Sequence, residues 1–176
     1  MVQKRALQLS KSIRYLLIFF IVSLILSGVT AFPLETELKW VCSWWPEKQS
    51  AFYIWLNTCM QAISDTNANY PYLAYGYDWL AFAHLVIAVV FIGPLRDPVK
   101  NIWVIEFGII ACAMIIPLAL IAGHIRQIPF FWRLIDCSFG LVGWIPLYYC
   151  HKKIRLLEQL QSSISVNKTS SINVAA

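Results

Sequence analysis

Four long apolar runs constrain this chain more than any other feature of its sequence. They extend over about residues 15–32, 78–95, 102–123 and 129–150. A helix crosses the hydrocarbon core of a bilayer with roughly 20 apolar residues, and each run is close to that length. Only 13% of the residues are charged, whereas soluble domains carry about 25%. The sequence therefore predicts an all-α integral membrane protein, a four-transmembrane-helix bundle, and excludes a soluble globular domain.

The ends of the chain differ from these runs. The first run resembles a signal peptide, because Val29-Thr30-Ala31 is a tolerable cleavage site, but its apolar stretch is long for one. We therefore expect a retained anchor and a single membrane domain over residues 1–158. Residues 159–176 are polar and lack periodicity, so we expect a disordered cytoplasmic tail.

The basic residues predict which side of the membrane each segment occupies. Lys and Arg are enriched in cytoplasmic loops. With the N-terminus inside, ten of the 14 Lys and Arg residues lie on that side: Lys4, Arg5, Lys11, Arg14, Arg96, Lys100, Lys152, Lys153, Arg155 and Lys168. The outer side then carries Lys39, Lys48, Arg126 and Arg133. Both termini are predicted to be cytoplasmic, and the net charge of +5 needs no nucleic-acid partner.

Residues 33–77 form the large outer loop, which is rich in Trp and Tyr. These side chains settle at the headgroup level of a bilayer. Apolar residues recur at helical spacing over 49–63. We expect short interfacial helices that lie on the outer surface of the membrane.

Two cysteines, Cys42 and Cys59, share this loop, and the predicted orientation exposes them to an oxidising compartment. They either form a disulfide or remain separate thiols. A quinone-linked thiol oxidoreductase is disfavoured because the chain has no C-x-x-C pair.

Ionisable residues inside membrane spans mark sites or structural locks, because burying them in lipid is unfavourable. At about 1.5 Å of helical rise per residue, Ser27, His84 and Asp136 fall at a similar depth in the outer half. The sequence therefore predicts a polar layer there.

Three interpretations of this layer remain open. Arg133 pairs with Asp136 at i, i+3 as a structural lock. Alternatively, His84, Asp136 and His124 bind a metal or haem, since two His and a carboxylate suit zinc or iron. In the third, Ser27, His84 and Asp136 act as nucleophile, base and orienter on a lipid. Proton or ion translocation is a further alternative.

The predicted inner face holds a second group of charges around Glu106. Arg96 or Lys100 neutralises Glu106 in the structural interpretation. In the functional one, Arg96, Lys100 and Lys152 form a clamp for an anion or a lipid headgroup.

Small residues follow one face of each of the last two spans, and such residues let helices approach closely. The first stripe is Gly108, Cys112, Ala119 and Gly123, and the second continues from Arg133 and Asp136 to Gly140 and Gly143. We expect both stripes to face inward.

Three stretches carry a resemblance: Tyr70-Pro-Tyr-Leu-Ala-Tyr-Gly-Tyr-Asp-Trp-Leu-Ala-Phe-Ala-His84, Phe91-Ile-Gly-Pro-Leu-Arg-Asp-Pro-Val-Lys-Asn-Ile-Trp-Val-Ile-Glu106 and Pro129-Phe-Phe-Trp-Arg-Leu-Ile-Asp-Cys-Ser-Phe-Gly140. Over residues 13–158 the chain resembles an uncharacterised family of small four-span bacterial inner-membrane proteins. The resemblance implies a bacterial plasma-membrane location and no particular activity.

The predicted function is binding of a lipid-like or small ligand, or of a metal, in the outer half. The candidate ligand-binding residues are His84, Asp136, Arg133, Asp78, Ser27, Glu106 and Arg126, and the candidate metal ligands are His84, His124 and Asp136. One alternative is a non-catalytic accessory or assembly subunit of a membrane complex, and another is an intramembrane enzyme acting on a lipid. The expected partners are membrane lipid and either further copies of the chain or another membrane protein.

Overall fold

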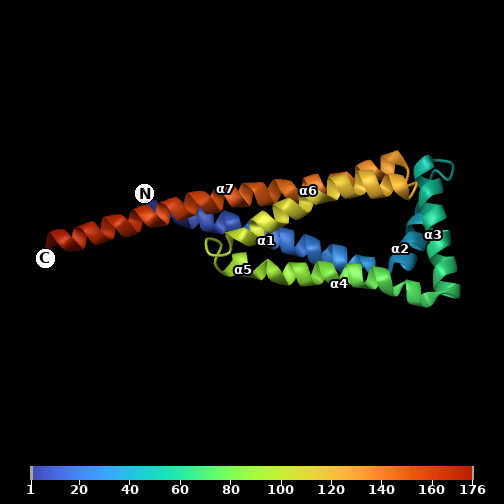
Figure 1. Cartoon of the computed structure of the whole chain (residues 1–176), viewed down its shortest axis with the longest axis horizontal. Helices are drawn as coiled ribbons and strands as arrows, with labels where there is room; N and C mark the ends of the chain where they lie inside the picture. The colour runs from blue at the N-terminus through green and yellow to red at the C-terminus, as the bar shows by residue number, and fades with distance from the viewer. Residues whose placement is uncertain (1, 176) are drawn as a thin grey trace. The chain divides into compact units, whose positions relative to one another are not determined.

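The computed structural model describes the backbone of residues 2–175 and the side chains of residues 3–164. Over this range the chain is all-helical (Figure 1), which confirms the predicted fold class. The elements are α1 (Val2–Ala31), α2 (Leu34–Trp44), α3 (Ala51–Asn69), the 3₁₀ helix η1 (Pro71–Leu73), α4 (Tyr75–Val90), α5 (Ile92–Arg96), α6 (Ile102–Ile125) and α7 (Phe130–Ala175).

Within the described residues, four segments are long and apolar enough to cross a membrane: Gln3–Ala31, Pro71–Arg96, Ile102–Ile125 and Phe130–Ile164. Each predicted apolar run coincides with one of them. Helix α1 begins before its run because Lys, Arg, Gln and Leu are good helix formers that extend the helix into the polar flank. Helix α7 continues to Ala175. The side chains from residue 165 onward, and the whole of residue 176, lie outside the described residues. The disorder predicted for residues 159–176 stays a prediction.

The chain divides into two compact units. Unit 1 comprises Met1–Ile21 and Val90–Ala176, and unit 2 comprises Val22–Val89. The prediction of one domain over residues 1–158 stays a prediction, and each unit is described by itself.

Unit 1 is built on the antiparallel pair α6 and α7, which lie side by side in Figure 1. The predicted small-residue stripe of α6 is buried at all four positions. A Cβ atom on Gly140 would lie 2.6 Å from the carbonyl oxygen of Cys112, a distance that real Cβ atoms essentially never show. Glycine is therefore needed where α7 crosses α6, and the prediction that the stripes face inward is confirmed at this crossing.

The core of unit 1 continues away from this crossing through large apolar side chains. Ile13 and Leu17 of α1, Ile105 of α6, and Leu147 and Ile154 of α7 are all at most 1% exposed. Phe91 and Phe20 add a ring contact, with centroids 4.7 Å apart.

Unit 2 contains α2 and α3 in the outer loop, where short helices were expected, and α2 packs against α3. In the same unit α1 approaches α4 closely, because a Cβ atom on Gly28 would lie 2.8 Å from the carbonyl oxygen of Ala81. Exposed aromatic pairs line this unit, among them Trp40–Trp44 and Tyr70–Tyr72. The interfacial position of α2 and α3 on a membrane stays a prediction.

Candidate functional site

Unit 2 contains a cavity of about 380 Å³ that is lined by Phe32, Tyr75, Asp78, Trp79 and Phe82. We call this cavity the Asp78 cleft. Four of its five lining residues are aromatic, and the fifth is a carboxylate. Small-ligand sites typically have volumes of about 300–1,000 Å³, so the cleft is large enough for a small ligand or a lipid headgroup.

Helix α4 supplies most of the Asp78 cleft because Tyr75, Asp78, Trp79 and Phe82 share one helical face. The Trp79 ring makes edge contacts with its neighbours, at 5.8 Å from Tyr75 and 6.1 Å from Phe82 between centroids. Phe32 comes from the junction between α1 and α2. The rings thus form an apolar wall beside a single acidic group.

Among the described residues, the side-chain carboxylate of Asp78 has neither a hydrogen bond nor an ion pair. It is half-buried and stands in the first turn of α4, where the helix dipole favours a negative charge. The carboxylate therefore lines the cleft without a protein partner among the described residues.

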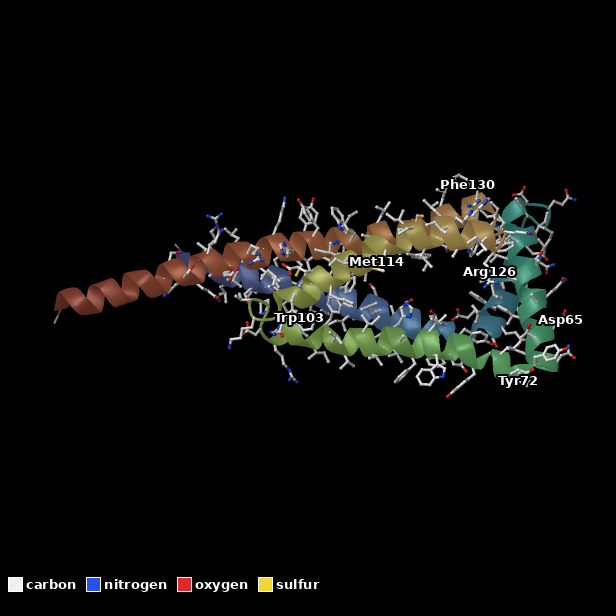
Figure 2. All side chains as sticks on the ribbon, viewed as in Figure 1. Asp65, Tyr72, Trp103, Met114, Arg126 and Phe130 are labelled. Carbon is white, nitrogen blue, oxygen red and sulfur yellow. The ribbon has the colours of Figure 1, made fainter. Side chains whose placement is uncertain are left out.

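Unit 1 has a second cavity that contains a carboxylate, with a volume of about 240 Å³. It is lined by Asp136 and Arg126 together with apolar side chains of α6 and Ile128. Figure 2 shows Arg126 near the α6–α7 turn, close to the start of α7 at Phe130. Both charged residues had been predicted as ligand-binding candidates.

The expected Arg133–Asp136 lock is wrong. No ion pair joins these two side chains in the part of the chain that the structure describes. Instead, the aliphatic stem of Arg133 covers Gly123 and its guanidinium lies 5.2 Å from the centroid of the Phe130 ring. The Nε atom of Arg133 is buried without a hydrogen-bond partner among the described residues. The i, i+3 spacing permitted a pair, but packing over Gly123 directs Arg133 elsewhere.

One ring nitrogen of His84 bonds to its own helix. Its Nδ1 atom donates to the carbonyl oxygen of Leu80 at 2.8 Å, and its Cβ atom lies beside Gly28 of α1. Ser27 is exposed on α1.

The predicted polar layer involves both units, since Ser27 and His84 belong to unit 2 and Asp136 to unit 1. The layer therefore stays a prediction. His124 is exposed at the end of α6. Within the described residues, no three His, Cys, Asp or Glu side chains gather in a way that could hold a metal ion. A metal or haem site formed by His84, His124 and Asp136 also stays a prediction.

Glu106 has partners other than those expected. Its Oε1 atom accepts from His151 Nε2 at 3.1 Å and from Arg155 at 3.3 Å, so the expectation of Arg96 or Lys100 is wrong. Because α6 and α7 are antiparallel, residues far apart in sequence come opposite each other. Gly123 lies against Arg133, and the same register brings residue 106 level with residue 151. This register cannot be predicted from residues that are close in sequence.

A polar network in unit 2 was missed by the sequence analysis. Glu35 accepts hydrogen bonds from Lys39 at 2.5 Å, from Ser64 at 2.9 Å and from Asn67 at 2.6 Å. Tyr77 of α4 donates to Asn67 at 3.1 Å. The hydrogen bond from Lys39, followed by those from Asn67 and Ser64, lowers the pKa of Glu35 from 4.5 to about 2. The network joins α2, α3 and the start of α4, next to Asp78.

The two loop cysteines lie in this helical hairpin, with Cys42 buried and Cys59 half-buried. Neither is in a disulfide in the structure. Burial, with a smaller effect of Cys42, raises the pKa of Cys59 above its ordinary value of 9.0. Whether the two thiols pair under oxidising conditions stays a prediction.

Comparisons of the chain with protein-family models, with curated proteins and with solved structures found no match. The findings define the coarse class of the chain, an all-helical protein with four helices long and apolar enough to span a membrane. The resemblance to a family of small four-span bacterial proteins stays a prediction.

Proposed function

We propose that this protein binds a phospholipid through its ammonium headgroup, as in phosphatidylethanolamine, and that the Asp78 cleft is the binding site. The protein acts in the plasma membrane of a bacterium, with both termini in the cytoplasm. The orientation rests on the distribution of Lys and Arg along the sequence. In this orientation the Asp78 cleft opens at the outer leaflet.

The observation that carries the proposal is an unpaired carboxylate set among four aromatic side chains in a cavity of about 380 Å³. Aromatic faces attract ammonium groups through their quadrupole, and an aromatic cage is a common way to recognise alkylated ammonium ligands. A carboxylate beside the rings adds a charge-assisted hydrogen bond to a primary ammonium. The same rings favour the headgroup level of the bilayer, where this ligand is abundant.

The cavity at Asp136 fits this ligand less well. Its volume of about 240 Å³ is below the usual range for ligand sites, and Arg126 in its lining repels a cation. Its lining also contains no aromatic ring. The Asp78 cleft is therefore the better site for an ammonium group.

The proposal is tested by measuring binding of phosphatidylethanolamine to the purified protein by native mass spectrometry in a mild detergent. Asp78→Asn keeps the side-chain size and the ability to accept a hydrogen bond at the start of α4, and it removes the charge. We expect the dissociation constant of the first bound lipid to rise roughly tenfold, the loss typical of one charge-assisted hydrogen bond.

Asp65→Asn is the matched control, because Asp65 is an exposed carboxylate of α3 in the same unit. It should bind the lipid as the wild type does. Equal binding by wild type and Asp78→Asn would contradict the proposal. In that case an accessory-subunit role, in which the exposed aromatic clusters contact another membrane protein, would become the better account.

A further inference from the structure

A second cavity with charged lining lies in unit 1, between α1 and the α4–α6 connection, and has a volume of about 300 Å³. We call it the basic groove. Its cationic members are Lys11 and Arg14 of α1 and Arg96 at the end of α5. The rest of its lining is Leu7, Ser10, Ile13, Leu17, Pro94, Leu95 and Pro98.

The three cations are available for a ligand. No hydrogen bond or ion pair joins Lys11, Arg14 or Arg96 to another group in the part of the chain whose side chains the structure describes. The carboxylate next to Arg96 in sequence, Asp97, instead accepts from the backbone of Lys100 and lies 3.6 Å from its Nζ atom. The groove therefore has three exposed positive charges and no carboxylate in its lining.

The floor of the basic groove is apolar. Leu7 is 60% exposed and Leu95 is half-buried, so both offer apolar surface to a ligand, whereas Ile13, Leu17 and Pro94 of the same lining are buried. The groove thus joins a cationic rim to a hydrophobic surface. A phospholipid complements both, because its phosphate matches the cations and its acyl chains match the apolar surface.

The position of the cations along the chain agrees with this chemistry. Lys11 and Arg14 directly precede the first apolar run, and Arg96 directly follows the second. Basic residues at such boundaries lie at the level of the lipid phosphates, and basic pockets between spans bind anionic headgroups. A soluble anion can bind the three cations, but it has no apolar part to pack against the apolar floor.

From these observations we infer that the basic groove binds an anionic phospholipid, with its phosphate at Arg96, Arg14 and Lys11 and an acyl chain against Leu7 and Leu95. This site differs from the clamp that the sequence suggested. Lys100 is paired with Asp97, and Lys152 lies 4.5 Å from the centroid of the Tyr148 ring, so neither lines the groove. The inference does not depend on the Asp78 cleft, because it concerns another unit and a lipid whose headgroup has a net negative charge and no ammonium group.

The test uses the full chain in bilayers and spin-labelled phosphatidylglycerol, whose immobilised fraction is measured by electron paramagnetic resonance. Arg96→Gln is expected to lower the relative association constant about fivefold, the usual effect of one basic residue near an anionic membrane surface. Arg96→Lys keeps the charge and should retain most of the association. Lys100→Gln is the matched control and should behave as the wild type, since Lys100 is an exposed cation four residues away and outside the groove.

Two results would overturn the inference. One is an equal association constant for wild type and Arg96→Gln when both have the same helical content by circular dichroism. The other is complete displacement of the labelled lipid by excess inorganic phosphate, which would make the groove a soluble-anion site. A further variant, Lys11→Gln/Arg14→Gln, keeps Arg96 and removes the two cations of α1. It should also lower the relative association constant of phosphatidylglycerol.

Discussion

The Asp78 cleft and the basic groove use opposite charges on similar apolar surfaces. The cleft places one unpaired carboxylate among four aromatic rings in about 380 Å³, and the groove places three cations beside aliphatic side chains in about 300 Å³. Aromatic rings strengthen the attraction of a carboxylate for an ammonium group, because their faces are negative. Aliphatic side chains have no such negative face, so they do not attract an ammonium group. The neighbouring apolar side chains therefore help to determine which headgroup each site prefers.

Reversal of the charge in the cleft should have the largest effect. Asp78→Lys places a cation among the rings, and we expect phosphatidylethanolamine binding to fall by more than roughly tenfold. Association of phosphatidylglycerol with the basic groove should not fall. Native mass spectrometry with each lipid in turn measures both effects, and Asp65→Lys is the control for added charge on the same unit. If Asp65→Lys lost the same binding, net charge rather than the cleft would be responsible.

Raised salt should weaken lipid binding at the two sites by different factors, and this difference is smaller than the effect of charge reversal. Raising ionic strength from about 0.1 M to about 1 M shortens the Debye length from about 10 Å to about 3 Å. The exposed cations of the groove are then screened, and phosphatidylglycerol association should fall several-fold. Phosphatidylethanolamine binding should fall less, because the rings and the half-buried Asp78 are less accessible to ions. An equal salt dependence at both sites, measured by electron paramagnetic resonance with the two spin-labelled lipids, would contradict this difference.

Removal of one ring tests the aromatic contribution to the cleft. Trp79→Leu keeps an apolar side chain and Asp78, and it removes the central indole of the cleft. We expect about threefold weaker binding of phosphatidylethanolamine, the size of one exposed cation–π contact. Trp44→Leu removes an indole that is 75% exposed on α2 outside the cleft, and it should leave binding unchanged. Equal binding of phosphatidylethanolamine by Trp79→Leu and Trp44→Leu, measured by native mass spectrometry, would contradict a contribution of the Trp79 ring.

The smallest expected effect concerns the network that holds the start of α4. The pKa of Glu35 is about 2 in the folded protein and 4.5 in the unfolded reference, so the carboxylate stabilises the α2–α3 hairpin above pH 4.5. This stabilisation is lost as the pH falls from 4.5 toward 2. Acid titration followed by tryptophan fluorescence should show a transition in this window in the wild type. Glu35→Gln should lack it, and a variant that retains the full transition would show that other carboxylates cause it.

The fold was predictable because its signal is local. Hydropathy over some 20 residues identifies a span without any knowledge of its neighbours, and helical spacing over residues 49–63 was enough to predict α3. The side-chain pairs were less predictable, because they depend on which helices meet. The Arg133–Asp136 pair was compatible with helical spacing but is absent from the described residues, since Arg133 packs over Gly123. Glu106 meets His151 and Arg155 across an antiparallel pair whose register no local pattern gives.

The candidate sites show the same limit. Asp78 could be predicted as an ionisable residue at the start of a span, and three of its aromatic neighbours share its helical face. Phe32 could not be predicted there, because it reaches the cleft from the α1–α2 junction. Likewise, Arg96 was a candidate headgroup ligand from its position in the loop. Lys11 and Arg14, which line the groove with it, lie some 80 residues earlier in the chain. The sequence therefore predicted a clamp of Arg96 with Lys100 and Lys152 instead.

The most direct test of the account places both lipids in competition. Wild type, Asp78→Asn and Arg96→Gln are reconstituted in nanodiscs that contain equal amounts of phosphatidylethanolamine and phosphatidylglycerol, and the lipids retained by the ejected protein are counted by native mass spectrometry. We expect each variant to lose one lipid: Asp78→Asn loses phosphatidylethanolamine alone, and Arg96→Gln loses phosphatidylglycerol alone. Retention of both lipids by both variants, or loss of the two lipids together in either variant, would contradict the account.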